Sequence, residues 1–133
     1  MLTIDTGYKP VAAQAEQVFT FLSDINNLQK LMPDRVENWK SDTDSCTFTI
    51  KGMADIGMKI EERQPNHTLK LVSHGKVPFN FKLDILIRPD ANGSGCESSI
   101  VFNGEINMFM KMMVETPLTN FFKMLLEKLP SQF

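Results

Sequence analysis

The stretch MFMKMMVETPLTNFFKMLLEKL, residues 108–129, decides the fold. After Pro117 its apolar residues recur at spacings of three and four, which predicts a helix with one face buried in a core. Thr116 and Pro117 also form a favourable helix start, so the segment is either one helix kinked at Pro117 or two helices that meet there. The predicted buried face consists of Leu118, Phe121, Phe122, Leu125, Leu126 and Leu129.

Residues 34–107, which precede this segment, alternate between apolar and polar positions, as half-buried strands do. Five stretches rich in Gly, Pro, Asn, Asp and Ser interrupt the alternation and predict turns. The connections are too short for parallel crossovers, so we expect six strands paired as antiparallel hairpins. The predicted turns are SDTDS (41–45), residues 52–55, QPNH (64–67), residues 75–78 and PDANGSG (89–95).

The N-terminal part adds a strand and two helical segments. Residues 2–9 alternate like a half-buried strand, which we expect Pro10 to end. Residues 13–22 have the apolar spacing of a helix, and a short second helical segment follows over residues 25–31. Met32-Pro33 closes it, because the residue before a proline is disfavoured in a helix. The sequence therefore predicts an α+β domain with a strand, two helices, six strands and a long closing helix.

This order of elements resembles the START-like superfamily, also called SRPBCC, which includes polyketide cyclases, coenzyme-Q-binding proteins and birch-pollen-allergen-like proteins. The resemblance implies a helix-grip fold, in which a curved seven-stranded antiparallel sheet surrounds the C-terminal helix and an apolar cavity lies between them. Its motifs are patterns rather than catalytic signatures, so they specify the fold better than the activity. The residues that carry it are AAQAEQVFTFLSDINNLQKLMP (12–33), CTFTIKG (46–52), ADIGMKIEE (54–62) and residues 108–129.

Composition limits the classes of protein. With 133 residues, 42% hydrophobic and 23% charged, the chain is expected to form a single globular domain over residues 1–133. A formal net charge of −2 without a basic stripe argues against a nucleic-acid partner. The start MLTIDTGYKP has no basic leader, and no apolar run approaches the ~18 residues of a membrane-spanning helix. We expect a cytoplasmic protein without an integral membrane segment, with Cys46 and Cys96 as reduced, buried thiols.

Few residues suggest catalysis or metal binding. His67 falls in a predicted turn, and a separation of seven would place it and His74 on opposite faces of a strand. Neither cysteine has a partner at ligand spacing, so we expect no metal and no cofactor. Glu62 continues the inward-facing row of its strand and is a weak candidate for a general acid or base; otherwise it is a solvated carboxylate at the strand end. Lys111 and Glu115 are expected to pair on the helix surface.

The residues expected to face a bound molecule come from the sheet and from the closing helix. Apolar strand positions line the concave face, and the methionines before Pro117 are flexible enough to line a pocket or its gate. Alternatively, these methionines fill an irregular core or form an oligomer contact. The predicted ligand-binding residues are Phe48, Ile50, Met58, Ile60, Phe81, Leu83, Phe102, Phe109, Met112, Met113, Leu118 and Phe122.

Three functional hypotheses follow. The first is a non-enzymatic binding or carrier protein for a small apolar or amphipathic molecule, such as a lipid, held between sheet and helix. In that case the methionine-rich segment is its gate, and Met112→Glu weakens uptake. The second is a cyclase- or dehydratase-like enzyme, for which Glu62 is the one candidate acid or base. The third is an interaction module whose exposed methionines form a homodimer or partner surface.

Overall fold

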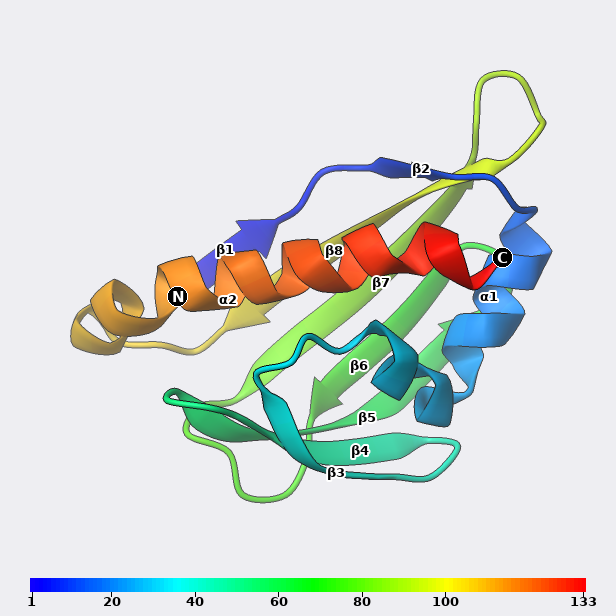
Figure 1. Ribbon diagram of the computed structural model, residues 1–133. Helices are drawn as coiled ribbons and strands as arrows, with labels where there is room; N and C mark the ends of the chain where they lie inside the picture. Colours follow the sequence, from blue (N-terminus) through cyan, green and yellow to red (C-terminus); the bar gives the residue numbers. More distant parts are fainter.

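The computed structural model describes residues 1–133, and its elements follow the predicted order along the chain (Figure 1). A strand in two pieces is followed by a helix, a 3-10 helix, six strands, a long helix and a final 3-10 turn. The elements are β1 (Leu2–Asp5), β2 (Lys9–Val11), α1 (Ala15–Ser23), η1 (Ile25–Leu31), β3 (Val36–Ser41), β4 (Ser45–Ile50), β5 (Ala54–Gln64), β6 (Thr68–Ser73), β7 (Phe81–Pro89), β8 (Cys96–Gly104), α2 (Met108–Lys128) and η2 (Leu129–Gln132).

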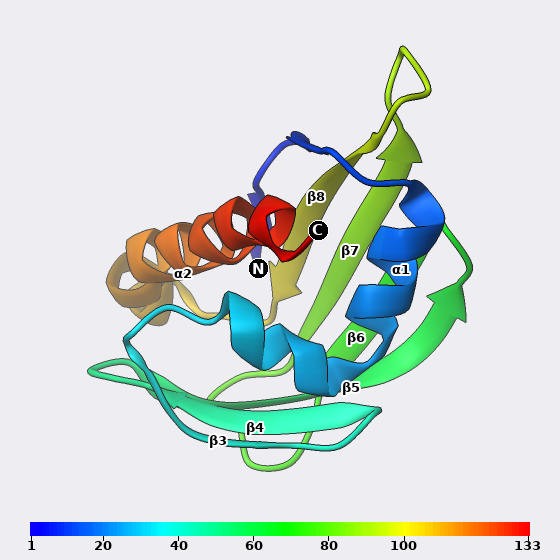
Figure 2. The same ribbon diagram turned by 45° about the vertical axis from the view of Figure 1, so that its right-hand side comes forward.

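All strands join one antiparallel sheet in the order β1-β8-β7-β6-β5-β4-β3, and β2 also pairs with β8. The sheet curves strongly, and α1, η1 and α2 lie on its concave side (Figure 2). Consecutive strands from β3 to β8 pair as hairpins, as their short connections require. The predicted α+β helix-grip fold is therefore confirmed.

The first strand is interrupted rather than continuous. Gly7 adopts a φ of 75°, a left-handed conformation that glycine tolerates, and pairing resumes at Lys9 in β2. The prediction that Pro10 ends the strand is wrong, because Pro10 lies inside β2 opposite Glu97. A proline can occupy an edge strand when its missing N–H would have faced away from the neighbouring strand. This interruption is why the sheet has eight strands instead of the predicted seven.

The closing helix α2 runs without a break from Met108 to Lys128, so of the two alternatives the single helix is correct. The Asn107 side chain caps it by accepting a hydrogen bond from the Met110 N–H at 2.8 Å. Pro117 lies in its interior and cannot donate a hydrogen bond to the carbonyl of Met113. The helix continues through this defect because its second half buries an apolar stripe against the sheet.

A chain of phenylalanine rings joins α2 to the sheet. Consecutive ring centroids in this chain are between 5.2 and 6.3 Å apart. Pairs at this spacing contribute roughly 0.5–1.5 kcal/mol beyond the burial of their surface. The rings therefore fix the position of the helix over β4, β7 and β8. From one end to the other they are Phe48, Phe121, Phe122 and Phe102, with Phe79 and Phe81 both against Phe102.

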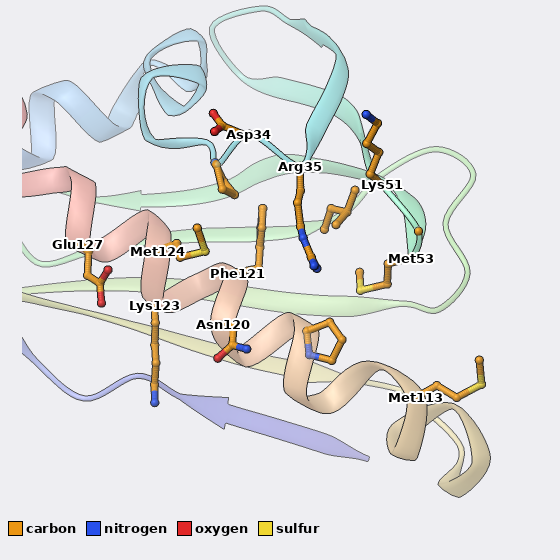
Figure 3. Close-up of a pocket in the computed structure, with 14 residues that line it drawn as sticks. Asp34, Arg35, Lys51, Met53, Met113, Asn120, Phe121, Lys123, Met124 and Glu127 are labelled. Atoms are coloured by element: carbon orange, nitrogen blue, oxygen red, sulfur yellow. The ribbon is translucent and has the colours of Figure 1, made fainter.

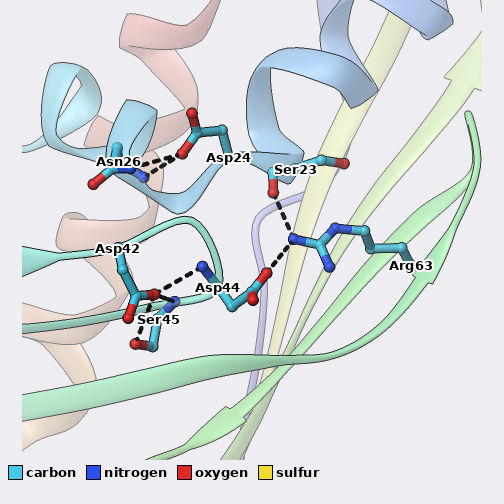
Figure 4. A network of polar contacts seen from close by, with 7 residues as sticks. All are labelled: Ser23, Asp24, Asn26, Asp42, Asp44, Ser45 and Arg63. Atoms are coloured by element: carbon cyan, nitrogen blue, oxygen red, sulfur yellow. Dashed lines mark hydrogen bonds and ion pairs between the residues drawn. The ribbon is translucent and has the colours of Figure 1, made fainter.

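A polar network holds the β3–β4 turn against the end of α1 (Figure 4). The Arg63 guanidinium, on β5, donates to the Ser23 carbonyl at 2.9 Å and to the Asp44 carboxylate at 2.7 Å. Within the turn, the Asp42 carboxylate accepts hydrogen bonds from the backbone N–H groups of Asp44 and Ser45. These bonds stabilise the charged form, so the pKa of Asp42 lies below its ordinary value of 3.8.

Candidate functional site

The interior between the sheet and α2 is almost completely filled. Two voids of about 20 Å³ each remain, and both have entirely apolar walls. A space of this size holds roughly one water, whereas sites for small organic molecules measure about 300–1,000 Å³. Eight of the twelve predicted ligand-binding residues surround one of them, which we call the inner void: Phe48, Ile50, Met58, Phe81, Leu83, Phe102, Leu118 and Phe122.

The other four predicted residues lie elsewhere. Ile60 is half-buried beside the core without bordering the inner void. Phe109, Met112 and Met113 are 73%, 82% and 63% exposed, on the first turns of α2 that project beyond the sheet (Figure 1). Phe109 and Met112 therefore border neither the inner void nor the groove on the outside of the molecule. Met113 instead borders this groove.

This groove, of about 570 Å³, runs along α2 (Figure 3). One wall is α2, from Met113 to Glu127, and the opposite wall consists of residues 33–35 and 50–53. Its volume lies within the range of small-molecule sites. Both walls carry apolar as well as charged side chains, so the groove suits a molecule that has an apolar and a polar end.

The groove and the inner void share a wall. Ile50 and Phe121 border both spaces. The Phe121 ring stacks on Phe48 with centroids 5.9 Å apart and meets Phe122 edge-on at 5.5 Å. The Phe121 ring therefore stands between the groove and the inner void.

Cationic groups outnumber anionic groups around the groove. Arg35, Lys51 and Lys123 line it together with Asp34 and Glu127. Only the Arg35 side chain extends across the groove toward α2, while those of Asp34, Lys51 and Lys123 point away (Figure 3). The Arg35 guanidinium is therefore a charged group that extends between the two walls of the groove.

Glu62 does not face the concave side of the sheet. Ile60 pairs with the buried Leu71, but Glu62 pairs with Lys70, whose side chain projects from the opposite face. The extra residue, Glu61, is a bulge that shifts the register of β5 by one position. The predicted inward orientation of Glu62 is therefore wrong, and its carboxylate is exposed on the convex face.

The remaining polar candidates do not meet one another. His67 is exposed in the β5–β6 turn, as predicted, and His74 is exposed after β6. The expected ion pair between Lys111 and Glu115 is not formed, since the three ion pairs of the protein involve other residues. No group of three or more histidine, cysteine, aspartate or glutamate side chains has metal-binding geometry.

Both cysteines are buried and free, as predicted. Burial raises the pKa of the Cys46 thiol to about 12, with a smaller contribution from the negative charge of Asp42. Burial also raises the pKa of Cys96. The thiolate is the nucleophilic form of cysteine, so neither side chain is activated for chemistry at neutral pH.

A curved antiparallel sheet that holds a C-terminal helix against an apolar interior is the helix-grip fold of the START-like (SRPBCC) superfamily. Within that class, the chain belongs to the family described as polyketide cyclase / dehydrase and lipid transport, whose model matches residues 6–133. No match was found among the curated proteins.

Solved structures share the fold at low sequence identity. Protein TTHA0849 from Thermus thermophilus is 13% identical with a TM-score of 0.77, over 98% of this chain and 96% of that one. Protein CV1439 from Chromobacterium violaceum is 17% identical with a TM-score of 0.73, over 99% and 97%. The Aha1 dimer from Colwellia psychrerythraea is 17% identical with a TM-score of 0.66, over 98% and 97%. These likenesses show the fold alone.

Sequence reasoning missed two residues that shape the groove, Arg35 and Met53. They lie in the connections on either side of the β3–β4 hairpin, where no periodicity indicates which way a side chain points. Phe121 belongs to the predicted buried stripe of the closing helix, but the stripe does not reveal that this ring separates two spaces. The groove was not predicted because the connections between strands and helices have no hydrophobic periodicity that would show which side chains face it.

Proposed function

We propose that the protein binds a small amphipathic molecule without transforming it, with the polar end in the groove and the apolar end directed through the shared wall toward the inner void. The observation that carries this proposal is that Ile50 and Phe121 separate a groove of about 570 Å³ from an entirely apolar space beneath α2. The family description, which includes lipid transport, supports the same class of ligand. The cyclase-like alternative is less well supported, because Glu62, the acid or base considered for it, does not line the groove.

The affinity of such a ligand comes from burial of its apolar end. Each buried methylene contributes about 0.8 kcal/mol, which corresponds to about a fourfold gain in affinity. Met53, Phe121 and Met124 supply the apolar contact surface of the groove. A homologous series of alcohols is therefore expected to bind more tightly with each added methylene until the chain exceeds the available space.

The proposal is tested by blocking the groove from its helix wall. Asn120 is exposed and lines the groove, so Asn120→Trp is expected to weaken binding of the neutral dye N-phenyl-1-naphthylamine at least about tenfold. Fluorescence titration measures the dissociation constant, and circular dichroism checks that the fold is retained. Native mass spectrometry of the freshly purified protein, followed by solvent extraction, identifies any molecule carried from the cell.

The matched control is Thr116→Trp, which adds the same ring to an exposed position of α2 outside the groove. It is expected to bind the dye like the unmodified protein. Equal binding by both variants, or no saturable binding of the dye by any of them, contradicts the proposed site.

A second candidate function is self-association through the apolar tip, which we define as Met108, Phe109, Met112 and Met113. Each of these side chains is 63% to 82% exposed, and contiguous exposed apolar patches commonly mark interaction sites. One structural relative is described as a dimer. No helix of the protein is both long and apolar enough to cross a membrane.

Self-association predicts a concentration-dependent mass in light scattering. Met112→Lys combined with Met113→Lys is expected to reduce the mass to that of a monomer. Burying two unpaired charges in a dimer contact costs free energy, which destabilises the dimer. Thr116→Lys, on the same exposed side of α2, is the control and is expected to leave the mass unchanged. A monomeric mass for the unmodified protein at all concentrations eliminates this candidate.

A further inference from the structure

We propose that the groove selects amphiphiles with an anionic head, a carboxylate or a phosphate monoester, and that Arg35 binds this head. The inference rests on the proposed function and adds the chemical class of the ligand. The carrying observation is an exposed guanidinium group that reaches across a groove with apolar and charged walls and has no partner inside the protein.

The backbone around Arg35 is fixed from both sides. The carbonyl of Arg35 accepts a hydrogen bond from the N–H of Lys51 at 2.9 Å, which ties it to the β4–β5 turn. The carbonyl of Pro33 accepts one from the N–H of Val36 at 3.0 Å, and Pro33 itself is buried. The start of the Arg35 side chain is therefore held in place, while its far end crosses the groove toward α2, between Met53 and Phe121 (Figure 3).

The guanidinium group of Arg35 takes part in none of the three ion pairs of the protein and in no side-chain hydrogen bond. The neighbouring Asp34 points away from it (Figure 3). Glu127, the other acid of the groove, lies 3.9 Å from Lys9 on its far side. No carboxylate of the protein therefore neutralises Arg35.

The chemistry of the guanidinium defines the ligand. Arginine presents a planar set of donors that matches two oxygens of a carboxylate or phosphate. Charge-assisted hydrogen bonds of this kind are shorter and stronger than those between neutral groups. Asn120 on the facing helix, whose amide makes no hydrogen bond in the protein, offers a further donor. The apolar chain attached to the anion then lies against Phe121 and Met124.

The test compares three probes with equal chains: decanoate, decyl phosphate and the neutral 1-decanol. Titration calorimetry of the unmodified protein is expected to give at least one anion an affinity about tenfold to a hundredfold above that of decanol, as a charge-assisted hydrogen bond implies. The anion that binds more tightly distinguishes a fatty-acid-like ligand from a phosphate monoester. Arg35→Glu is expected to remove this preference, so that the anions bind this variant no more tightly than decanol does.

Two controls separate recognition by Arg35 from the general charge of the surface. Lys51→Glu makes the same change of charge at a side chain that points away from the groove, and it is expected to retain most of the preference for the anion. Arg35→Lys is expected to bind the anions with intermediate affinity, because it keeps the charge but loses the planar fork. Equal affinity for anions and decanol, or equal losses in Arg35→Glu and Lys51→Glu, overturns the head-group assignment while leaving amphiphile binding intact. Failure of all three probes to bind overturns both proposals.

Discussion

Phe121→Ala is expected to lower the free energy of unfolding by about 3–5 kcal/mol, the usual cost of truncating a buried phenylalanine. The side chain is buried, and its ring stacks on Phe48 and meets Phe122 edge-on. Its loss removes these aromatic contacts and leaves a cavity where the ring was. Urea denaturation followed by tryptophan fluorescence measures the change, because Trp39 stacks on Phe48 within the same cluster.

The same variant is also expected to join the groove to the inner void, since Phe121 borders both. A neutral apolar ligand that binds the folded state then restores part of the lost stability. The restored free energy rises with the logarithm of the ratio of ligand concentration to dissociation constant. N-phenyl-1-naphthylamine is therefore expected to stabilise Phe121→Ala more than it stabilises the unmodified protein.

Phe102→Ala is the matched control for this opening. Phe102 borders the inner void but not the groove, and its ring is as deeply buried. It is expected to lose a similar free energy of unfolding and to gain less from the dye, because its cavity stays closed. Phe133→Ala, at a ring that is 45% exposed, is expected to change stability little. An equal gain from the dye in Phe121→Ala and Phe102→Ala contradicts the assignment of Phe121 as the shared wall.

Gly57→Ala is expected to destabilise the protein by about 1–3 kcal/mol through overpacking between strands. A methyl group at this position would overlap the backbone carbonyl oxygen of His74. That oxygen belongs to backbone, and His74 is held to Gly57 by an N–H···O bond of 2.8 Å, so it cannot move away without separating β5 from the end of β6. Thermal unfolding monitored by circular dichroism measures the effect.

The control for Gly57→Ala is Lys59→Ala, two residues farther along the same strand at an exposed position. It is expected to alter stability by less than about 0.5 kcal/mol, as surface substitutions usually do. Equal stability of Gly57→Ala and Lys59→Ala would contradict the close approach of residue 57 to the His74 carbonyl oxygen.

Most of the fold could be predicted because its signals are local. Alternation along residues 34–107 and the turn residues between strands correspond to all six hairpin strands, and the short connections require them to be antiparallel. The stripe from Leu118 to Leu129 is buried as expected. The failures come from single-residue irregularities, which periodicity does not indicate: the interruption at Gly7 and the bulge that turns Glu62 outward.

Less of the candidate site could be predicted, because a site depends on the space between side chains. The sequence identified most of the residues around the inner void. It did not show that these side chains leave only about 20 Å³ of empty space between them. It also predicted that Phe109 and Met112 line a pocket or its gate, whereas both side chains are exposed on the first turns of α2, which extend beyond the edge of the sheet. The groove is formed by segments that are distant in sequence, so no local pattern contains it.

Side-chain periodicity and turn chemistry act within a few residues, so they predict the order of the elements, the antiparallel pairing, the apolar face of the sheet and the buried stripe of the closing helix. Three other features emerge from packing between distant segments: α2 continues through Pro117, the interior is packed nearly full, and Ile50 and Phe121 separate it from the groove. Arg35 also crosses that groove. The curvature of the sheet and the packing of the phenylalanine rings place residues 33–35 and 50–53 opposite α2. The spacing of residues along the sequence does not indicate how far apart these segments lie in space.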